Sequence, residues 1–175
     1  MLRDLFCNYS PYLLGGLYFR LGINLVPESE HPVDLGGVRR ICVLADSDTD
    51  ELNHITPMLR SLRDRIPGVR VTVVLSAGEK ADAMEDSDLV DEIFTLQEKR
   101  VFRKIRDDWP DLTIATGNGI MSAKMAFRTG ARYRLGFRYD HMSKHNTGFL
   151  FTHTIPLDES KSESEQLSNL IQKLL

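Results

Sequence analysis

Four carboxylates stand within six consecutive residues in the first third of the chain: Asp46, Asp48, Asp50 and Glu51. An apolar run at residues 41–45 comes directly before them, and apolar residues at helical spacing follow. This order predicts a strand, a turn and a helix, which is the first half of a βαβ unit. Because open α/β folds place their chemistry at the turn that leaves the carboxyl end of a strand, these carboxylates are the first candidate site.

A calcium loop of the EF-hand type is a first interpretation of this turn. Such a loop begins D-x-D-x-D, as Asp46, Asp48 and Asp50 do. It also needs glycine at its sixth position and glutamate at its twelfth. This chain has Glu51 and Pro57 there, so the spacing excludes a calcium loop.

A phosphatase of the haloacid-dehalogenase type is a second interpretation. Asp46 would be the nucleophile, Asp48 an acid and base, and carboxylates would hold Mg²⁺. Ser76, at the end of the β-rich run 69–76, matches the second motif of that family. The later acidic pair at a strand end is missing, because Asp107 and Asp108 end a predicted helix. The pattern therefore fits a phosphatase only in part.

A third interpretation makes one carboxylate a general base. Attack by a sugar hydroxyl needs a positioned proton acceptor near neutral pH. Asp50 or Glu51 could take the proton, and His54 could orient the substrate or help to transfer it. The same residues also suit a structural role, in which the acids cap the helix and favour its dipole while His54 lies on the helix surface. The spacing leaves both alternatives open.

A second candidate site is the turn Gly117-Asn118-Gly119, which follows an apolar run at residues 112–116. Glycines at a strand-to-helix turn let a ligand approach the backbone, and a helix N-terminus favours anions such as phosphate. A turn that only needs positive φ angles would contain the same residues, and G-x-G alone is weak evidence for a dinucleotide site. A basic cluster further on suits either an anionic acceptor or a solvated loop: Arg132, Arg134, Arg138, His141, Lys144 and His145.

Strands and helices alternate from residue 38 onward. Strands are predicted at residues 41–45, 69–76, 89–96, 112–116, 133–137 (as an edge strand) and 149–155. Helices are predicted around Ile55, Leu59 and Leu62, and at residues 78–84, 98–107, 120–128 and 159–174. This rhythm predicts an α/β domain at residues 38–175, with a parallel sheet covered by helices on both faces.

Residues 1–37 are predicted to be a hydrophobic helical extension followed by a polar linker. Residues 2–26 are unusually apolar, but no run reaches the roughly 20 residues that a membrane-spanning helix needs. The segment suits an interfacial helix at a membrane surface, or a helix packed on its own domain or on a second subunit.

Composition narrows the classes of function. The chain has 175 residues, of which 42% are hydrophobic and 27% charged, and its formal net charge is −3. A nucleic-acid-binding protein would normally carry a basic excess, so we expect no nucleic-acid partner. The two cysteines, Cys7 and Cys42, do not have metal-site spacing, and no signal peptide is evident. We therefore expect a buried thiol at Cys42 and a cytoplasmic protein.

Four segments are informative because of their order along the chain. They are HITPMLRSLRDRIPGVRVTVVLSAG at 54–78, SDLVDEIFTL at 87–96, DLTIATGNGIMSAKMAFRTGARYRLGF at 111–137 and THTIPLDESKSESEQLSNLIQKLL at 152–175. In this order they resemble glycosyltransferase family 9, the bacterial lipopolysaccharide heptosyltransferases. The first is similar to the family's T-x-P and R-x-x-x-P-G run, and the second to its N-x-x-V-D-E-V strand. The third is similar to its D-L-(V/A)-I-D-x-x-G-x-x-R-S-A block, and the fourth to the stretch before the interdomain linker. The resemblance covers residues 38–175 and concerns the N-terminal, acceptor-side domain.

The resemblance implies a Rossmann-like sheet that forms one half of a GT-B fold. It also implies inverting, metal-independent transfer of a sugar from a nucleotide sugar, ADP-heptose, to a glycolipid or core-oligosaccharide acceptor, without any other cofactor. The N-terminal half would bind the acceptor and supply the base, and a C-terminal half would bind the donor. Residues 2–26 would then make a peripheral contact with the inner membrane.

The resemblance also assigns roles to individual positions. Counted back from Pro57, the family's catalytic aspartate falls on Glu51, or on Asp50 if the turn has one extra residue. Met121 stands where the family has a basic residue. The implied acceptor-binding residues are His54, Asn118, Gly119, Ser122 and Lys124. Transfer would need a missing donor domain or a partner chain, and the alternative is a non-catalytic binding or assembly module derived from the same fold.

Overall fold

The computed structural model describes residues 32–45, 51–76, 88–117, 119–138, 150–158 and 160–173, with the backbone alone described at 51–53. The predicted extension at residues 2–26 and the predicted helical piece at 78–84 lie outside these ranges. Among the described residues, no helix is long and apolar enough to cross a membrane.

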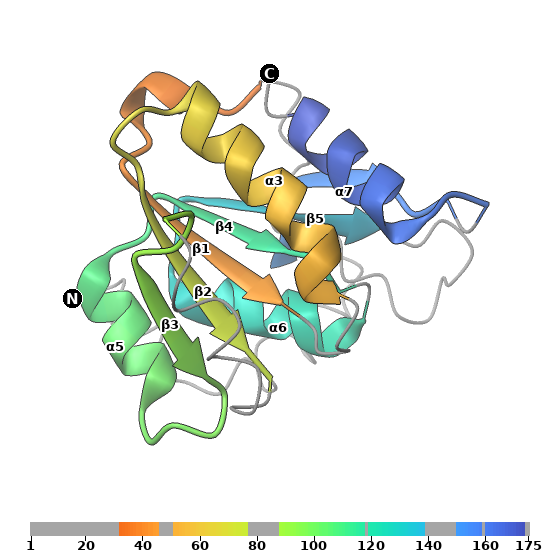
Figure 1. Ribbon diagram of the computed structural model, residues 1–175. Helices are drawn as coiled ribbons and strands as arrows, with labels where there is room; N and C mark the ends of the chain where they lie inside the picture. Colours follow the sequence, from red (N-terminus) through yellow and green to blue (C-terminus); the bar gives the residue numbers. More distant parts are fainter. Residues whose placement is uncertain are drawn as a thin grey trace.

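A six-stranded parallel sheet forms the centre of the described structure (Figure 1). The strands lie in the order β3-β2-β1-β4-β5-β6, and every neighbouring pair is parallel. The predicted parallel sheet is therefore confirmed. The strands are β1 Arg40–Ala45, β2 Arg70–Leu75, β3 Glu92–Thr95, β4 Leu112–Ala115, β5 Tyr133–Arg138 and β6 His153–Pro156.

Helices cover both faces of this sheet. α3 (Glu51–Arg65) and α7 (Glu163–Gln172) lie side by side on one face, and α5 (Val101–Asp108) and α6 (Ile120–Thr129) lie on the other (Figure 1). A short 3-10 helix, η1 (Leu35–Gly37), precedes β1. Val33 and Val38 on either side of η1 are both buried in the core, so the packed unit takes in residues before Val38.

Burial on both faces explains why the central strands are continuous apolar runs. In β1 and β2 an exposed arginine is followed by five buried residues. Successive side chains of a strand point to opposite faces. Ile41 and Val43 therefore pack in the core under α3 and α7, whereas Cys42 and Leu44 pack in the core against α5 and α6. Two hydrophobic cores thus hold the sheet between two helical layers.

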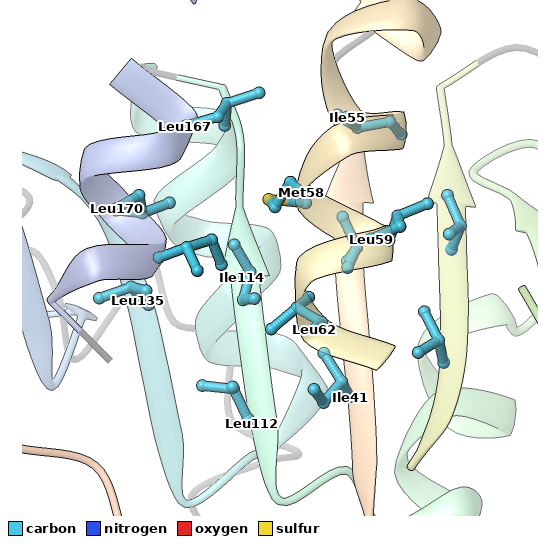
Figure 2. Close-up of a cluster of buried hydrophobic side chains, with 14 of the residues drawn as sticks. Ile41, Ile55, Met58, Leu59, Leu62, Leu112, Ile114, Leu135, Leu167 and Leu170 are labelled. Carbon is cyan, nitrogen blue, oxygen red and sulfur yellow. The ribbon is translucent and has the colours of Figure 1, made fainter. Parts of the chain in front are cut away.

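Figure 2 shows the core between the sheet and the α3–α7 layer. Ile55, Leu59 and Leu62 of α3, which the spacing predicted to share one face, are all almost completely buried there. Leu167 and Leu170 of α7 fill the same core from the neighbouring helix. Burying one such side chain contributes roughly 1.5–3 kcal/mol, so this face supplies most of what holds α3 and α7 in place.

α3 continues through a proline. Pro57 lies inside the helix, where it removes one backbone hydrogen bond and costs about 3 kcal/mol in an isolated helix. Pro57 therefore lies within the helix and not at its start, which the structure places at Glu51. The buried residues Met58 and Leu59 directly after the proline offset this cost by packing on the sheet.

The ends of α5 and α6 show two ways to stop a helix. Gly130 ends α6, as predicted, with a left-handed φ of 77° and its N–H donated to the Phe127 carbonyl. Trp109 ends α5 with a left-handed φ of 54°, although it is not a glycine. Pro110 follows and prevents the helix from continuing.

β5 is an inner strand, so the predicted edge strand at residues 133–137 is wrong. It pairs with β4 on one side and with β6 on the other. A charged residue is typical of an edge strand, but the Arg134 guanidinium lies against the backbone. Its Nε donates to the Leu150 carbonyl at 2.7 Å and its Nη1 to the Ala131 carbonyl at 2.8 Å.

Gly136 allows an aromatic ring to lie directly on β5. A Cβ at this position would stand 2.8 Å from Cε2 of Phe151, and closer still to Cζ and Cε1. Phe151 is itself buried in the core against α5 and α6. The absence of a side chain at Gly136 is therefore what lets the segment before β6 close over the sheet.

Aspartates close the amino edge of the sheet, which is the side where the strands begin. Oδ2 of Asp111 accepts the N–H groups of Arg39 and Arg40 at 2.8 and 3.0 Å. Oδ2 of Asp91 accepts the N–H of Val71 at 2.6 Å and Nη2 of Arg63 at 2.7 Å. These charge-assisted hydrogen bonds satisfy strand ends, so this edge has a structural role.

Gly136→Ala is expected to destabilise the fold by about 1–3 kcal/mol, because the methyl group would overpack against Phe151. Gly37→Ala is the matched control, since Gly37 is exposed and a Cβ there would lie 3.6 Å from its nearest neighbour. The control should change the free energy of unfolding by less than about 0.5 kcal/mol. Urea unfolding followed by circular dichroism measures both, and equal stabilities of the two variants would contradict the packing of Phe151 on β5.

Candidate functional site

The two turns selected from the sequence leave adjacent strands in the middle of the sheet. β1 and β4 are paired, with Leu44 opposite Ala115 near their carboxyl ends. From β1 the chain crosses one face through α3 to reach β2, and from β4 it crosses the other face through α6 to reach β5. Such a topological switch point is where open α/β sheets bind their ligands. The turns at residues 46–50 and 117–119 both begin there.

Thr116 joins the two strands at this point. Its N–H and its hydroxyl both donate to the carbonyl oxygen of Leu44, each at 3.1 Å. Thr116 is buried, so these hydrogen bonds are shielded from water. They hold the start of the glycine turn beside the last residues of β1.

Gly119 provides space rather than an unusual backbone conformation. It is the N-cap of α6, with an extended φ of −94° and ψ of 166°, which any residue can adopt. A Cβ there would meet its nearest atom, the backbone N of Met121, only at 4.0 Å. The explanation of this position by a positive φ is therefore wrong, and the open space in front of the helix is its distinctive feature. Asn118 lies outside the described residues.

The first turns of α6 place the predicted acceptor-side residues at different depths. Ser122 is 1% exposed and belongs to the buried face of the helix, whereas Lys124 is partly buried. Ile120 and Met121 are 43% and 56% exposed. The surface beside the glycine turn is therefore largely apolar, with one lysine a turn further along.

The acidic turn is described only where the helix begins. Asp46, Asp48 and Asp50 lie outside the described residues, and so does the side chain of Glu51. The backbone of Glu51 opens α3 at the carboxyl end of β1, where the helix dipole favours negative charge. The roles of Glu51 and Asp50 remain predictions.

His54 and Glu163 come together at the same edge although they lie 109 positions apart. Nδ1 of His54 is 2.9 Å from Oε2 of Glu163. His54 belongs to the first turns of α3 and Glu163 is the first residue of α7, and both helices begin at the end toward which the strand arrows point (Figure 1). The two side chains are 33% and 65% exposed, so a ligand at this edge can reach the pair.

A capping box fixes the start of α7. The Ser162 hydroxyl accepts the N–H of Glu165, and the Glu165 carboxylate accepts the N–H of Ser162 at 2.9 Å. The hydrogen bonds that the Glu165 carboxylate accepts from the N–H and the hydroxyl of Ser162 hold the pKa of Glu165 below its usual range. The box places the first turn of the helix, and Glu163 with it, beside α3.

Ser76, the residue matched to a phosphatase motif, follows β2 next to the end of β1. Its Oγ is buried without a hydrogen bond to any described residue. In the part of the chain that the structure describes, no three His, Cys, Asp or Glu side chains gather as a metal site requires. Asp46 and Asp48 lie outside that part, so the phosphatase interpretation remains untested.

Within the basic cluster, the described arginines do not form one anion site. Arg134 is committed to two backbone carbonyls, and its guanidinium lies 5.6 Å from the centre of the Phe127 ring. Burial lowers the pKa of this guanidinium. Arg132 is exposed and lies over the Tyr133 ring at 5.0 Å. Arg138 is the partly buried last residue of β5, and His141, Lys144 and His145 lie outside the described residues.

Cys42 is buried in the middle of β1, as predicted. Burial, with a smaller contribution from Asp108, raises the pKa of its thiol far above the usual range. The thiol therefore stays neutral, and only a thiolate is a good nucleophile. Cys42 is a core residue without a role in chemistry at this site.

The sequence did not identify two residues of this edge, Thr116 and Glu163, as members of the site. Thr116 closes an apolar strand, where threonine is common, and Glu163 lies in a charged segment of ordinary composition. The S-x-x-E pattern at residues 162–165 was the available indication that α7 begins there and not at residue 159. That Thr116 reaches Leu44, or Glu163 reaches His54, follows only from the tertiary fold.

An open parallel sheet in the order 3-2-1-4-5-6, with its candidate residues at the switch point, defines an α/β protein of the Rossmann-like class. No family model matches the sequence, and no curated protein matches it.

Solved structures do match the fold. The E. coli ADP-heptose LPS heptosyltransferase II aligns over 75% of this chain with 19% identity and a TM-score of 0.63. A family 9 glycosyl transferase from Veillonella parvula aligns over 83% with 21% identity and a TM-score of 0.65. The E. coli heptosyltransferase WaaC with ADP aligns over 78% with 15% identity and a TM-score of 0.65.

These matches confirm the predicted fold, a Rossmann-like domain of the kind found in heptosyltransferase structures. At such identities the likeness concerns the fold alone. It covers 39%, 43% and 46% of the three similar chains, so this chain matches less than half of each.

Arg134→Ala is expected to destabilise the fold by about 2 kcal/mol or more, because two charge-assisted hydrogen bonds to the Leu150 and Ala131 carbonyls are lost. Arg132→Ala removes the same charge from an exposed neighbour and should cost less than about 1 kcal/mol. Thermal and urea unfolding of both variants test this difference. Equal losses would mean that the Arg134 hydrogen bonds contribute nothing beyond charge.

Cys42 is expected to resist alkylation while the protein is folded, because its buried thiol stays protonated. Iodoacetamide labelling of a Cys7→Ser variant, followed by mass spectrometry, should give modification only at denaturant concentrations that unfold the chain. Rapid labelling of the folded protein would contradict the burial of this thiol.

Proposed function

We propose that this chain is the acceptor-binding half of a heptosyltransferase-like glycosyltransferase. One observation carries the proposal. The two candidate turns leave adjacent strands at the switch point of a sheet whose fold matches heptosyltransferase structures over 75–83% of this chain. That edge is the ligand-binding edge of open α/β sheets in general.

The proposed reaction is an inverting transfer of a heptose-like sugar to a hydroxyl of a lipopolysaccharide-core-type acceptor. The hydroxyl oxygen attacks the anomeric carbon of a nucleotide sugar such as ADP-heptose. The bond from that carbon to the diphosphate breaks, and the nucleoside diphosphate leaves with the electron pair. The proton of the hydroxyl goes to a carboxylate of the acidic turn, Glu51 or Asp50, which avoids forming a free alkoxide. The scheme uses no metal ion and no further cofactor.

The acceptor would approach through the surface in front of α6. Gly119 leaves this surface open, and Lys124 offers a cation beside the apolar residues Ile120 and Met121. Asn118 would complete the glycine turn. Ser122 is buried, so its proposed part is to seat α6 on the sheet and not to touch the acceptor.

A second half would bind the donor sugar. This half would lie on a further stretch of the same polypeptide or on a partner protein. The matched heptosyltransferase structures extend well beyond the part that this chain matches. The proposed setting is the cytoplasmic face of the inner membrane, with residues 2–26 as the peripheral contact.

The second candidate is a non-catalytic binding or assembly module, which needs only the part of the fold that this chain shares with the matched structures. A domain that keeps the acceptor edge without a donor half would bind the saccharide and present it to a partner enzyme. The two candidates share the acceptor site and differ only in whether sugar is transferred.

Acceptor binding is expected to perturb only the carboxyl edge of the sheet, which is the side where the strands end. In amide spectra of the ¹⁵N-labelled chain, a deacylated lipopolysaccharide-core oligosaccharide should shift His54, Thr116 and Gly119. Arg40 and Asp111 at the amino edge should not move. An oligosaccharide that leaves the carboxyl edge unperturbed at millimolar concentration would contradict the proposal.

Adding ADP-heptose together with a donor-binding half, supplied as a longer chain or as a separate protein, separates the two candidates. Release of ADP that falls by about 10²-fold or more in Glu51→Gln or Asp50→Asn, with acceptor binding kept, indicates a transferase with that residue as base. Retained acceptor binding without ADP release indicates the binding module.

A further inference from the structure

We propose that His54 and Glu163 form a hydroxyl-binding pair at the carboxyl edge of the sheet. Glu163 holds the imidazole by Nδ1, and Nε2 accepts a hydrogen bond from a hydroxyl of the bound saccharide. The inference rests on the proposed function and adds to it the chemical group that this part of the edge recognises.

The contact between the two residues determines which ring nitrogen carries the proton. An ionised carboxylate can only accept hydrogen bonds, so a hydrogen bond from Nδ1 to Oε2 at 2.9 Å requires a proton on Nδ1. In a neutral imidazole the other nitrogen then has a lone pair and no proton. Nε2 is therefore a hydrogen-bond acceptor, and its natural partner is a hydroxyl or amide donor.

His54 is also placed where a ligand can reach it. Its side chain is 33% exposed, and Nε2 makes no hydrogen bond to any residue that the structure describes. The residue lies one helical turn after Glu51, at the beginning of α3 and beside the switch point of the sheet. The free ring nitrogen thus belongs to the same edge as the acidic turn and the glycine turn.

Holding the two helices together does not account for the pair. α3 and α7 already share a continuous apolar core that includes Leu62 and Leu170. The Glu163 side chain is 65% exposed, and ion pairs this exposed stabilise proteins little. Removing the carboxylate should therefore change the ring far more than it changes the fold.

Surrounding charge favours a neutral hydroxyl over a phosphate at this point. Glu163 and Glu165 both stand in the first turn of α7, where they repel an approaching anion. Lys161, just before that turn, is paired with Asp158 at 3.3 Å. An Nε2 without a proton cannot donate to a phosphate oxygen, so this ring nitrogen does not assist anion binding.

The tautomer can be read directly in the full chain by long-range ¹H–¹⁵N correlation spectra recorded at about pH 8. The expected result for His54 is a protonated Nδ1 and an unprotonated Nε2. Glu163→Ala should shift the ring toward the tautomer protonated at Nε2, without a large fall in melting temperature. Asp64→Ala is the matched control, because it removes one exposed carboxylate from the far end of α3 and should leave the tautomer unchanged.

Ligand titration tests the recognition step. The deacylated core oligosaccharide should move the Nε2 resonance of His54, whereas inorganic phosphate should not. His54→Phe keeps a ring of similar size without nitrogen atoms and should weaken oligosaccharide binding about fivefold, the value of one hydrogen bond. Glu163→Ala should weaken it to a similar or smaller extent, and Asp64→Ala not at all.

The outcomes separate this inference from the proposed function. A wild-type ring protonated at Nε2, or an oligosaccharide that binds at the carboxyl edge without moving Nε2, overturns the hydroxyl-binding pair alone. Movement of Nε2 by phosphate and not by the oligosaccharide also overturns it, in favour of an anion site. No oligosaccharide binding at all overturns the proposed function, and the recognition role of His54 with it.

Discussion

Burial of the parallel sheet on both faces is the constraint on which the rest of the structure depends. Five consecutive buried residues in β1 and again in β2 leave no face of these strands for water or ligand. Each strand must therefore be followed by a helix that returns across one face, and the apolar stripes of α3, α5, α6 and α7 meet this need. Only the two edges where strands end remain for polar chemistry.

The two edges are used differently. At the amino edge, Asp91 and Asp111 accept strand N–H groups and arginine side chains, so their carboxylates are occupied. At the carboxyl edge, the chain divides to opposite faces after β1 and β4, and the described helices α3, α5, α6 and α7 begin. Among the described residues, glycine, exposed apolar side chains and a histidine–glutamate pair lie at that edge. This contrast in satisfied polar groups is the physical reason for placing function at the carboxyl edge.

Close backbone contacts make that edge rigid. The double hydrogen bond from Thr116 to Leu44 fixes β4 against β1. Gly136 allows Phe151 to cover β5. Arg134 holds the segment before β6 by donating a hydrogen bond to the Leu150 carbonyl. Because β5 and β6 are fixed in this way, α7 can pack beside α3 and bring Glu163 to His54. A site residue at the end of the chain thus depends on a glycine and an arginine that never approach the ligand.

The sequence by itself determined the local features of this protein. Period-two and period-3.6 apolar patterns place the strands and the buried face of α3, including Ile55, Leu59 and Leu62, because these patterns depend only on neighbouring residues. The turns after β1 and β4 were recognisable from their acids and glycines. The order of the strands in the sheet could not be recognised from the sequence, because strand pairing is a long-range property. Arg134 locally resembles an edge residue, yet β5 lies inside the sheet and its guanidinium binds carbonyls. Only the tertiary fold decided that Thr116 joins β1 and that Glu163 contacts His54, which lies 109 positions away. These contacts form only when the six strands have paired in the observed order.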